Sequence, residues 1–407
     1  MKKVCPECNQ EYDSWWCKPC NLLHFENNFD KWTSGNETID KFIQDAQLNT
    51  DIRGGKIIEW IPYDRFKDIK QIAKGGYATI YYAKRVDGFI IKQWDIENQQ
   101  WKRYGQSEVV LKKFDNILDI NEDFLNEMAI HLRTNVKNAS VGLHGITKDP
   151  ETHEYMIVLQ YYKGGSLRNY LNNNFNNFNW FGKLYILSYL AVVMAKIHKL
   201  DIVHRDFHPG NILRYGKGDY FSVNISDFGL SKLITESKKN SQKNTISGVL
   251  PYIAPEVLIG GEYTKAADVY SFALVAYELI TGLPPYHDVA HDKDLAFKIC
   301  NGFRPKIPFH TPKLITQIIM RCWDARTTHR PKFEELDKVL TRYYNDYFEK
   351  KTTSEIKIQI KEAKEFSNQT SVTTPTNYKT HPQAIYTKLT ASFYQINSSD
   401  DDDAIYI

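Results

Sequence analysis

The chain has 407 residues, 42% of them hydrophobic, so it exceeds one typical domain and can bury a sizeable core. Its formal net charge of +3 excludes the clearly basic surface that marks a dedicated nucleic-acid-binding domain. No apolar run approaches the ~20 residues of a membrane helix, and the amino terminus lacks the apolar region of a secretory signal, so we expect a cytoplasmic protein.

Four of the six cysteines lie in the first twenty residues, as two CxxC pairs. They are Cys5, Cys8, Cys17 and Cys20. Four thiolates match the tetrahedral geometry and the soft sulfur ligands of zinc. Because about thirty residues are too few to bury a core, bound metal would have to stabilise a zinc-ribbon-like segment over residues 1–30. The alternative is a disordered leader with incidental cysteines.

Residues 31–62 are predicted to form an amphipathic helix and a linker. Within Glu37–Leu48, four apolar residues recur at the i, i+3, i+4 and i+7 spacing of one helix face. They are Ile39, Phe42, Ile43 and Ala46. This stripe must be buried against a neighbour, and the following domain is the nearest surface.

From about residue 63 the pattern changes to that of strands. Strands are predicted over Phe66–Ala73, Thr79–Arg85, Gly88–Gln93 and Tyr155–Tyr161. A Gly-containing turn over residues 74–78 joins the first two, and by itself it is consistent with an ordinary hairpin. A helix is expected at Phe124–Ile130, so residues 94–116 are interpreted as an insertion before it.

The following region is predicted to be mainly helical. Long or periodic apolar segments occur at Phe178–Leu200, Asp268–Ile280, Lys313–Trp323 and Phe333–Tyr344. Residues 230–247 are rich in Ser, Thr, Asn and Lys, which favours a mobile loop. Residues 348–407 are polar and end in an acidic run, so most of this tail is expected to be disordered, with a marginal helix at 354–366.

One ordered set of polar residues points to chemistry. His204-Arg205-Asp206 is followed by Asn211, and Asp227-Phe228-Gly229 comes after a β-rich run. Phosphoryl transfer needs a carboxylate near the attacking hydroxyl and further oxygen ligands for magnesium. In this order and spacing, the motifs resemble the catalytic and metal-binding loops of the eukaryotic protein kinase family.

The resemblance implies a role for each residue of the catalytic region. Asp206 would accept the proton of the substrate hydroxyl, while Asn211 and Asp227 would hold Mg²⁺. Arg205 would hold a phosphorylated activation loop, whose candidate sites are Ser237, Ser241, Thr245 and Ser247. His208 stands where Ser/Thr kinases carry a lysine that contacts the γ-phosphate. It can replace that lysine in part, or it can simply pack the loop.

The resemblance also implies an ATP site. Ala73, Gly75 and Ala78 take the three glycine positions of the phosphate-covering loop, and Lys92 takes the place of the third-strand lysine, with Glu127 as its helical partner. The remaining residues implied to contact the nucleotide are Lys74, Gly76, Tyr77, Ile80, Leu159, Gln160 and Tyr162. Only one of the three glycines is kept, which is consistent with weaker nucleotide affinity.

Further pairs are implied in the carboxyl-terminal half. Glu256 of Ala254-Pro255-Glu256 would pair with Arg330, and Asp268 would anchor the backbone of the catalytic loop. Residues 164–167, 251–256 and 321–323 resemble the tyrosine-kinase-like group. The CxxC leader followed by residues 32–36 resembles a lineage-expanded set of fungal signalling kinases.

We therefore expect an α+β protein with a bilobal kinase fold at 63–347, a β-rich N-lobe and a helical C-lobe. The expected function is ATP- and Mg²⁺-dependent phosphorylation of Ser/Thr hydroxyls on a protein substrate in intracellular signalling. Tyrosine or dual specificity, a pseudokinase scaffold, and a zinc segment carrying the main function remain alternatives. Neither a membrane nor a nucleic acid is expected as a partner.

Overall fold

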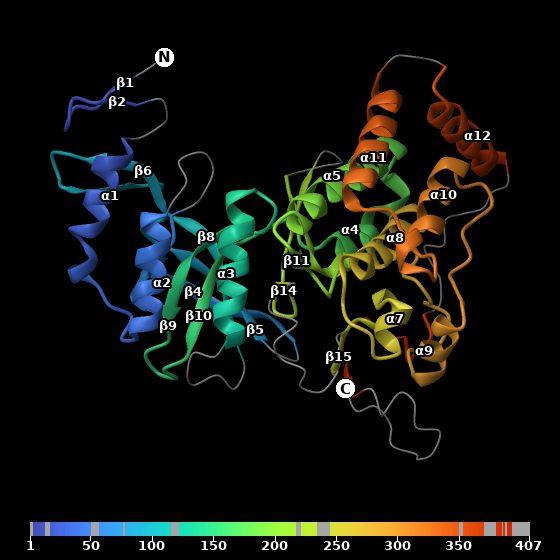
Figure 1. The fold of residues 1–407 in the computed structure, drawn as a ribbon, viewed down its shortest axis with the longest axis horizontal. Coiled ribbons are helices and arrows are strands. Elements are labelled where there is room, and N and C mark those ends of the chain that lie inside the picture. The colour runs from blue at the N-terminus through green and yellow to red at the C-terminus, as the bar shows by residue number, and fades with distance from the viewer. Residues whose placement is uncertain are drawn as a thin grey trace. The chain divides into compact units, whose positions relative to one another are not determined.

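The computed structural model of the protein describes residues 3–12, 17–49, 57–75, 78–114, 122–216, 221–233, 245–349, 353–369, 380–384, 386 and 389–392. The chain divides into two compact units, Met1–Tyr161 and Tyr162–Ile407. A sheet dominates the first unit and helices dominate the second (Figure 1). The predicted α+β class is therefore confirmed.

A six-stranded sheet lies at the centre of the first unit, in the order β3-β9-β10-β8-β5-β4. Its strands are β3 (Glu59–Trp60), β4 (Phe66–Lys74), β5 (Ala78–Arg85), β8 (Ser107–Phe114), β9 (Leu143–Lys148) and β10 (Tyr155–Gln160). All neighbours are antiparallel except β3 and β9. One apolar cluster beneath the sheet contains Ile61, Phe66, Ala83, Val109, Leu111, Met156 and Val158. Strands β4, β5 and β10 confirm the strands predicted at Phe66–Ala73, Thr79–Arg85 and Tyr155–Tyr161.

Helices α2 (Glu37–Leu48) and α3 (Glu122–Val136) pack in the same unit. Asn36 caps α2, since its side-chain oxygen accepts hydrogen bonds from the backbone N–H groups of the first turn. Ile39 and Ile43 are fully buried, and Gln47 donates to the carbonyl oxygen of Ile58 at 2.8 Å. The predicted amphipathic helix thus exists and buries its stripe against this unit.

A hairpin between β5 and β8 corrects the sequence interpretation of residues 86–116. Its strands, β6 (Ile90–Asp95) and β7 (Gln100–Arg103), pair with each other and form a sheet separate from the six-stranded one. The predicted strand at Gly88–Gln93 therefore does not join the central sheet. The third long strand is β8, which lies inside the range that we interpreted as an insertion.

The amino-terminal segment packs against this hairpin. It comprises β1 (Lys3–Val4), β2 (Glu11–Tyr12) and α1 (Lys18–Glu26), which lies beside β6 in Figure 1. The rings of His24 and Trp94 stack with centroids 3.9 Å apart, and those of Phe25 and Trp101 stack at 4.5 Å. Aromatic stacking thus joins two segments that are far apart in the sequence.

The second unit is mainly helical. They are α4 (Leu167–Asn174), α5 (Trp180–His198), α7 (Pro255–Leu258), α8 (Lys265–Thr281), α9 (Lys293–Cys300), α10 (Lys313–Cys322), α11 (Phe333–Phe348) and α12 (Glu355–Gln369). Nearly every residue of α8 is buried. Among the described residues, α5 alone has the length and composition of a membrane span, contrary to the expectation that no such run exists. However, 67% of its apolar window is buried, as expected for a core helix.

Three two-stranded sheets hold the loops of this unit. β11 (Ile202–Val203) pairs with β14 (Lys232–Leu233), and β12 (Ile212–Tyr215) pairs with β13 (Ser222–Ile225). The third joins β15 (Thr245–Gly248) to β16 (Leu389–Ser392), the red strand beside β15 in Figure 1. A segment near the carboxyl terminus therefore lies against the end of the loop predicted to be mobile.

Two parts of the tail form regular structure: the helix expected at 354–366 and, contrary to the expectation of disorder, a strand. In α12, Ile356, Ile360 and Ala363 are buried, because they form an apolar stripe on one face of a helix that is otherwise polar. The other part contains β16.

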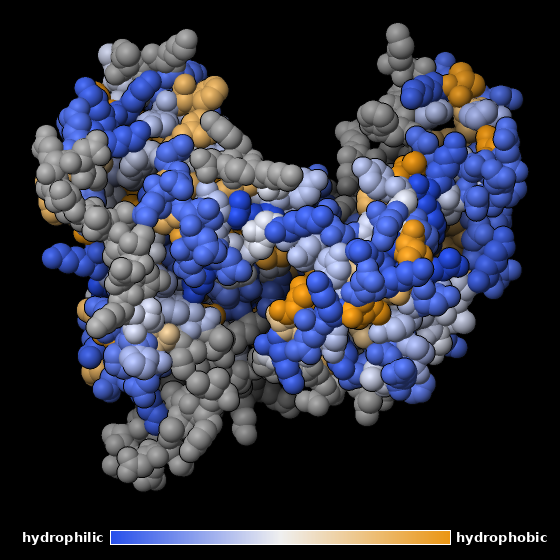
Figure 2. Space-filling view, turned by 180° about the vertical axis from the view of Figure 1, so that it is seen from behind, coloured by the Kyte–Doolittle hydropathy of each residue, from blue (hydrophilic) through white to orange (hydrophobic). Residues whose placement is uncertain are grey.

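Figure 2 shows one face of the molecule, on which apolar residues occur in small groups among hydrophilic ones.

Candidate active site

Strand pairing brings the two halves of the polar motif together. Ile212 and Ile225 are register partners in the β12–β13 hairpin, so the residue before β12 lies beside the residues after β13. The backbone N–H of Ser226 accordingly donates to the carbonyl oxygen of Asn211 at 2.9 Å. Asp227 follows Ser226 directly. The sequence separation between Asn211 and Asp227 is thus closed by one short hairpin.

Asp206 and Asn211 are hydrogen-bonded to each other. The Asn211 amide nitrogen donates to the Asp206 carbonyl oxygen at 3.0 Å and to its carboxylate at 3.2 Å. Asp206 is only 3% exposed. Because Asn211 makes these bonds through Nδ2, its amide oxygen is the atom suited to a hard cation such as Mg²⁺.

Asp268, at the start of α8, fixes the backbone that carries Asp206. Its carboxylate accepts hydrogen bonds from the N–H groups of His204 at 2.8 Å and of Arg205 at 3.0 Å. His198 lies 2.9 Å from the same carboxylate. All these groups are in the second unit, and the predicted anchoring role of Asp268 is confirmed.

Two residues of the motif have strained backbones. Arg205 has φ 69° and Asp227 has φ 60°, in the left-handed region that non-glycine residues rarely enter. Such conformations cost on the order of 1–3 kcal/mol each and persist only where surrounding bonds impose them. The hydrogen bond from the Arg205 N–H to Asp268 imposes the Arg205 conformation. At Asp227, the N–H of Gly229 donates to the carboxylate at 3.4 Å. Strain of this kind is typical of functional loops.

His208 lies against Asp206. Its Nδ1 accepts the backbone N–H of Gly210 at 3.0 Å, so the neutral ring carries its proton on Nε2, 3.6 Å from the Asp206 carboxylate. A Cβ atom at position 210 would come within 2.7 Å of this ring, which explains the glycine. The imidazole therefore both caps the turn and faces the candidate base. Its contact with a phosphate stays a prediction.

The Arg205 side chain lies near the end of the activation loop. Its guanidinium carbon is 5.3 Å from the centroid of the Tyr263 ring, and the Tyr263 hydroxyl donates to the carbonyl oxygen of Ser247 in β15. Desolvation lowers the pKa of Arg205, although Tyr263 and Asp268 oppose this shift. Among the described residues, the Nε atom of Arg205 has no hydrogen-bond partner. Ser237 and Ser241 lie outside the described residues.

The first unit contains one buried ion pair between its sheet and α3. Lys112 of β8 donates to the Glu127 carboxylate at 2.5 Å, and their side chains are 7% and 0% exposed. His131, one turn along α3, lies 3.4 Å from the same carboxylate. A buried ammonium held by a buried carboxylate is the arrangement expected for a phosphate-contacting lysine.

The pairing of Lys92 with Glu127 is therefore wrong. Lys92 belongs to β6, in the hairpin outside the six-stranded sheet, whereas Lys112 belongs to a central strand. The sequence carried a signal for this assignment. Val109-Val110-Leu111 is an apolar run with two β-branched valines that ends at Lys112, 15 residues before Glu127.

The predicted nucleotide-contacting residues of the first unit lie on β4, β5 and β10. Residues 73–75 and 78–80 flank a hairpin turn, in which the Gly75 N–H donates to the Ala78 carbonyl oxygen at 2.9 Å. Gly76 and Tyr77 lie outside the described residues. Leu159 is buried and Gln160 is half-buried, at the end of β10. Tyr162 belongs to the second unit, where its hydroxyl accepts from Asn224 at 2.9 Å.

The four clustered cysteines form a second candidate site. Their sulfur atoms lie within 4.8 Å of one another, with Cys5–Cys20 at 3.7 Å and Cys8–Cys17 at 3.6 Å. Zinc–sulfur bonds of about 2.3 Å in a tetrahedron place the sulfurs roughly 3.8 Å apart, so the donor set fits zinc. Burial opposes thiolate formation at Cys5, but backbone N–H groups of Cys8 and Glu7 outweigh it and lower the Cys5 pKa to about 7.

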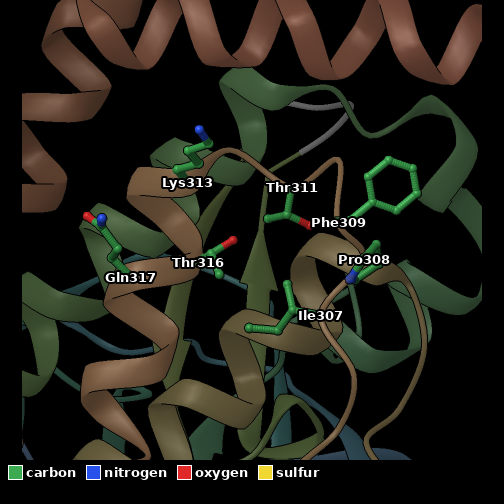
Figure 3. Close-up of a pocket in the computed structure, with 7 residues that line it drawn as sticks. All are labelled: Ile307, Pro308, Phe309, Thr311, Lys313, Thr316 and Gln317. Atoms are coloured by element: carbon green, nitrogen blue, oxygen red, sulfur yellow. The ribbon is translucent and has the colours of Figure 1, made fainter.

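The second unit also contains a hollow. It has a volume of about 250 Å³ and is formed by the start of α10 and the loop before it (Figure 3). The lining residues are Ile307, Pro308, Phe309, Thr311, Lys313, Thr316 and Gln317. None of them was predicted to contact a substrate, and they include no carboxylate. We therefore do not assign a catalytic role to the hollow.

Comparison with known proteins identifies the family. The family described as "Protein tyrosine and serine/threonine kinase" matches residues 66–340, well over half of the chain. The chain belongs to this family. The matched range lies within the predicted kinase domain of 63–347, and the predicted bilobal fold is confirmed by it and by the sheet-rich and helical units.

Several relatives of this kinase domain are named as serine/threonine-protein kinases. The probable kinase roco5 of Dictyostelium discoideum is 30% identical over 74% of this chain and 10% of its own length. A kinase of Arabidopsis thaliana is 24% identical over 80% of this chain and 52% of its own length. The chain thus spans between a tenth and about half of the length of these two relatives.

Two ion pairs of this kinase domain are recognisable. One joins α3 to the sheet, and the other lies at the end of the activation loop. Arg330 donates to the two carboxylate oxygens of Glu256 at 2.6 and 2.8 Å, which confirms the predicted pair. Both residues of this pair lie in the second unit. Lys112 is assigned to the third long strand of the kinase domain because it lies in β8 and because its ammonium is paired with Glu127 of α3.

Proposed function

We propose that the protein is an ATP- and Mg²⁺-dependent kinase that phosphorylates Ser and Thr hydroxyls of a protein substrate. The observation that carries this proposal is the complete set of charged and polar groups that phosphate transfer requires. Lys112 is paired with Glu127, and Asp206, Asn211 and Asp227 are held on two short loops. A scaffold that only bound a partner would have no physical need for all of them.

Each unit contributes a separate part of the mechanism. In the first unit, Lys112 would bind the α- and β-phosphates, with its ammonium oriented by Glu127. In the second, Asp206 would receive the proton of the attacking hydroxyl and, through its bond from Asn211, keep its carboxylate in one orientation. Asn211 and Asp227 would hold Mg²⁺, which neutralises charge on the transferred phosphate.

The donor set fits magnesium. Asn211 has an amide oxygen that takes no described hydrogen bond, and Asp227 has a carboxylate, both oxygen ligands of the hard type. His208 would stabilise charge on the γ-phosphate through the proton on its Nε2. The glycine replacements at Ala73 and Ala78 point to modest nucleotide affinity rather than to loss of turnover.

The finer assignments are also proposals. Residues 164–167, 251–256 and 321–323 support membership of the tyrosine-kinase-like group, and the CxxC leader supports the likeness to fungal signalling kinases. The spacing of the four sulfurs supports a structural zinc ion bound by Cys5, Cys8, Cys17 and Cys20. Thiolates of this kind persist in reducing compartments, which supports a cytoplasmic location.

The test is turnover with radiolabelled ATP on the purified full chain, with dephosphorylated casein as a general acceptor and phosphoamino-acid analysis of the product. Asp206→Asn is the matched control, because it removes the base but keeps the shape. Phosphoserine and phosphothreonine from the wild type, absent from the variant, are expected. Equal labelling by both proteins would contradict the proposal, and phosphotyrosine alone would overturn the specificity.

A further inference from the structure

The segment before β16 follows the surface of the second unit. The backbone N–H of His381 donates to the carbonyl oxygen of His287 at 2.8 Å, and the N–H of His291 donates to that of Gln383 at 2.9 Å. These bonds connect the tail to the loop between α8 and α9. Because both are main-chain bonds, they fix the path of the tail without requiring particular side chains.

Tyr386 then contacts a small group of residues of the second unit, which we call the Tyr386 site. Its hydroxyl donates to the carbonyl oxygen of Pro285 at 2.9 Å, and its ring centroid lies 4.7 Å from that of His291, nearly edge-on. The guanidinium carbon of Arg168 is 4.7 Å from the centroid of the Tyr386 ring. A cation, an aromatic edge and a carbonyl oxygen together recognise an aromatic side chain with a polar tip.

The Tyr386 site is connected to the segment that follows β15. Arg168 donates to the Tyr252 hydroxyl at 2.5 Å and to the Glu278 carboxylate at 3.0 Å, and the Tyr252 hydroxyl also donates to that carboxylate. Burial works against the charge of Arg168, but Glu278 and the tyrosines overcome it and raise the pKa of the guanidinium. Arg168 is therefore a fixed cation beneath the ring of Tyr386.

Three residues later, the tail pairs with the activation loop. β16 runs antiparallel to β15, with Leu389 opposite Gly248 and Ser392 opposite Thr245. The Gly248 end of β15 is the one nearest the catalytic loop, because a Cβ atom there would lie 3.6 Å from the carbonyl oxygen of Arg205. The tail thus occupies a strand edge that is fixed next to the candidate catalytic residues.

We propose that the described residues of the tail, 380–384, 386 and 389–392, occupy the surface on which this kinase holds an extended protein substrate. We also propose that this surface selects an aromatic residue three positions before the paired strand. The inference rests on the proposed function. Strand addition supplies affinity that depends little on sequence, while a side-chain pocket beside it supplies specificity. Both elements are present here, and both are filled by the tail.

A tethered occupant competes strongly even when its contacts are few. A segment joined to its own binding surface has an effective concentration in the millimolar range. A substrate in solution must displace it, so the apparent KM for the substrate rises as the undocked fraction falls. ATP does not compete for β15 or the Tyr386 site, and its KM is unaffected by the tail.

Truncation after Lys379 tests the proposal directly. The truncated chain should show a KM for casein lower by a factor of about 5 to 100, the range of typical intramolecular couplings, with unchanged kcat and unchanged KM for ATP. Tyr386→Ala in the full chain should give part of this decrease, and Tyr386→Phe less of it. Phe309→Ala is the control, since it removes an 81% exposed aromatic residue of the same unit.

A synthetic peptide of residues 380–396 should inhibit the truncated enzyme competitively with casein and not with ATP. The proposal is overturned if truncation leaves the casein KM unchanged, or if it lowers kcat alone, as loss of a purely structural strap would do.

Hydrogen exchange separates this proposal from the proposed function. Amides 245–248 should exchange faster in the truncated chain than in the full chain, whether or not the protein transfers phosphate. Unchanged protection of these amides would sink the docking proposal even in an active kinase. Conversely, an inactive protein whose amides lose protection would refute the kinase function and leave the docking intact.

Discussion

Replacing Lys112 by Met should abolish phosphate transfer and also destabilise the first unit. The Lys112 ammonium is 2.5 Å from the Glu127 carboxylate, and the two side chains are 7% and 0% exposed. Removing one partner of such a pair leaves a buried charge without compensation and costs about 3–5 kcal/mol of unfolding free energy. His131 at 3.4 Å can offset part of this cost, so the lower end of the range is expected.

The effect on turnover has a different origin. The lysine stabilises charge on the phosphates, and removing one such group from an excluded site typically lowers kcat by about 10²–10³-fold. A Lys112→Met/Glu127→Leu double variant should therefore recover stability, because no charge remains buried, but should not recover turnover. Urea unfolding followed by radiometric ATP assays measures the two quantities on the same preparations.

Lys92→Met is the matched control for this experiment. Lys92 belongs to the β6–β7 hairpin, so both stability and turnover should stay close to those of the wild type. If Lys92→Met inactivated the enzyme while Lys112→Met did not, the assignment drawn from the ion pair would be refuted. A double variant with restored turnover would equally contradict the phosphate-contacting role.

Three further changes address the second unit. Asp206→Asn and Asp227→Asn should each abolish transfer with the fold retained by circular dichroism, and Asp227→Asn should also weaken Mg-ATP binding in calorimetry; near wild-type turnover in both would disprove the assigned roles. His208→Lys should stay active and His208→Ala should slow kcat by about 10-fold or more, the loss of one charge-stabilising donor; an unimpaired His208→Ala enzyme would leave the histidine only its turn-capping role. Phosphatase treatment should lower activity in the wild type and have no effect in Arg205→Ala, and equal activity before and after treatment would argue against a phosphate on the activation loop.

The residues of the second unit could be predicted from the sequence because their partners are few residues away or carry a unique motif. Asp206 and Asn211 lie five residues apart, and a single hairpin brings Asp227 to them. The pairing of Glu256 with Arg330 spans 74 residues, yet each partner lies in a distinct local motif. Short-range geometry and motif order were sufficient in these cases.

The lysine of the first unit could not be placed in this way, because two strands end in a similar pattern. Phe89–Lys92 and Val109–Lys112 are both apolar runs followed by lysine, and strand propensity does not distinguish a hairpin from a central strand. Packing distinguishes the two strands, since Val109 and Leu111 belong to the core cluster of the central sheet. Ile90 belongs instead to a separate cluster with Phe25 and Ile57.

The docked segment of the tail after α12 cannot be predicted from the sequence for a related reason. Its composition is polar, and average composition predicts disorder. Three buried apolar residues suffice for α12, and main-chain bonds suffice for the path of residues 381–383, neither of which raises the mean apolar content. Docking of a polar segment depends on the surface that receives it, which its own sequence does not reveal.

Removing the metal proposed for the amino-terminal segment should loosen the β6–β7 hairpin as well as the cysteine loops. Cys17 directly precedes α1 and Cys20 lies in its first turn, so a bound ion would fix the start of this helix. The same helix carries His24 and Phe25, which stack on Trp94 and Trp101 of the hairpin.

Chelation should therefore speed amide exchange across residues 90–103, while the cluster of β10 and β8 stays protected. Phe25→Ala is the matched variant, because it should loosen the hairpin at full metal content. The loss of a buried aromatic side chain costs about 3–5 kcal/mol in a well-packed core. A chelated protein whose hairpin exchanged at the original rate would show that the ion, if bound, acts only on its own loops. Zinc content that was unchanged by replacing the four cysteines with serine would remove the site altogether.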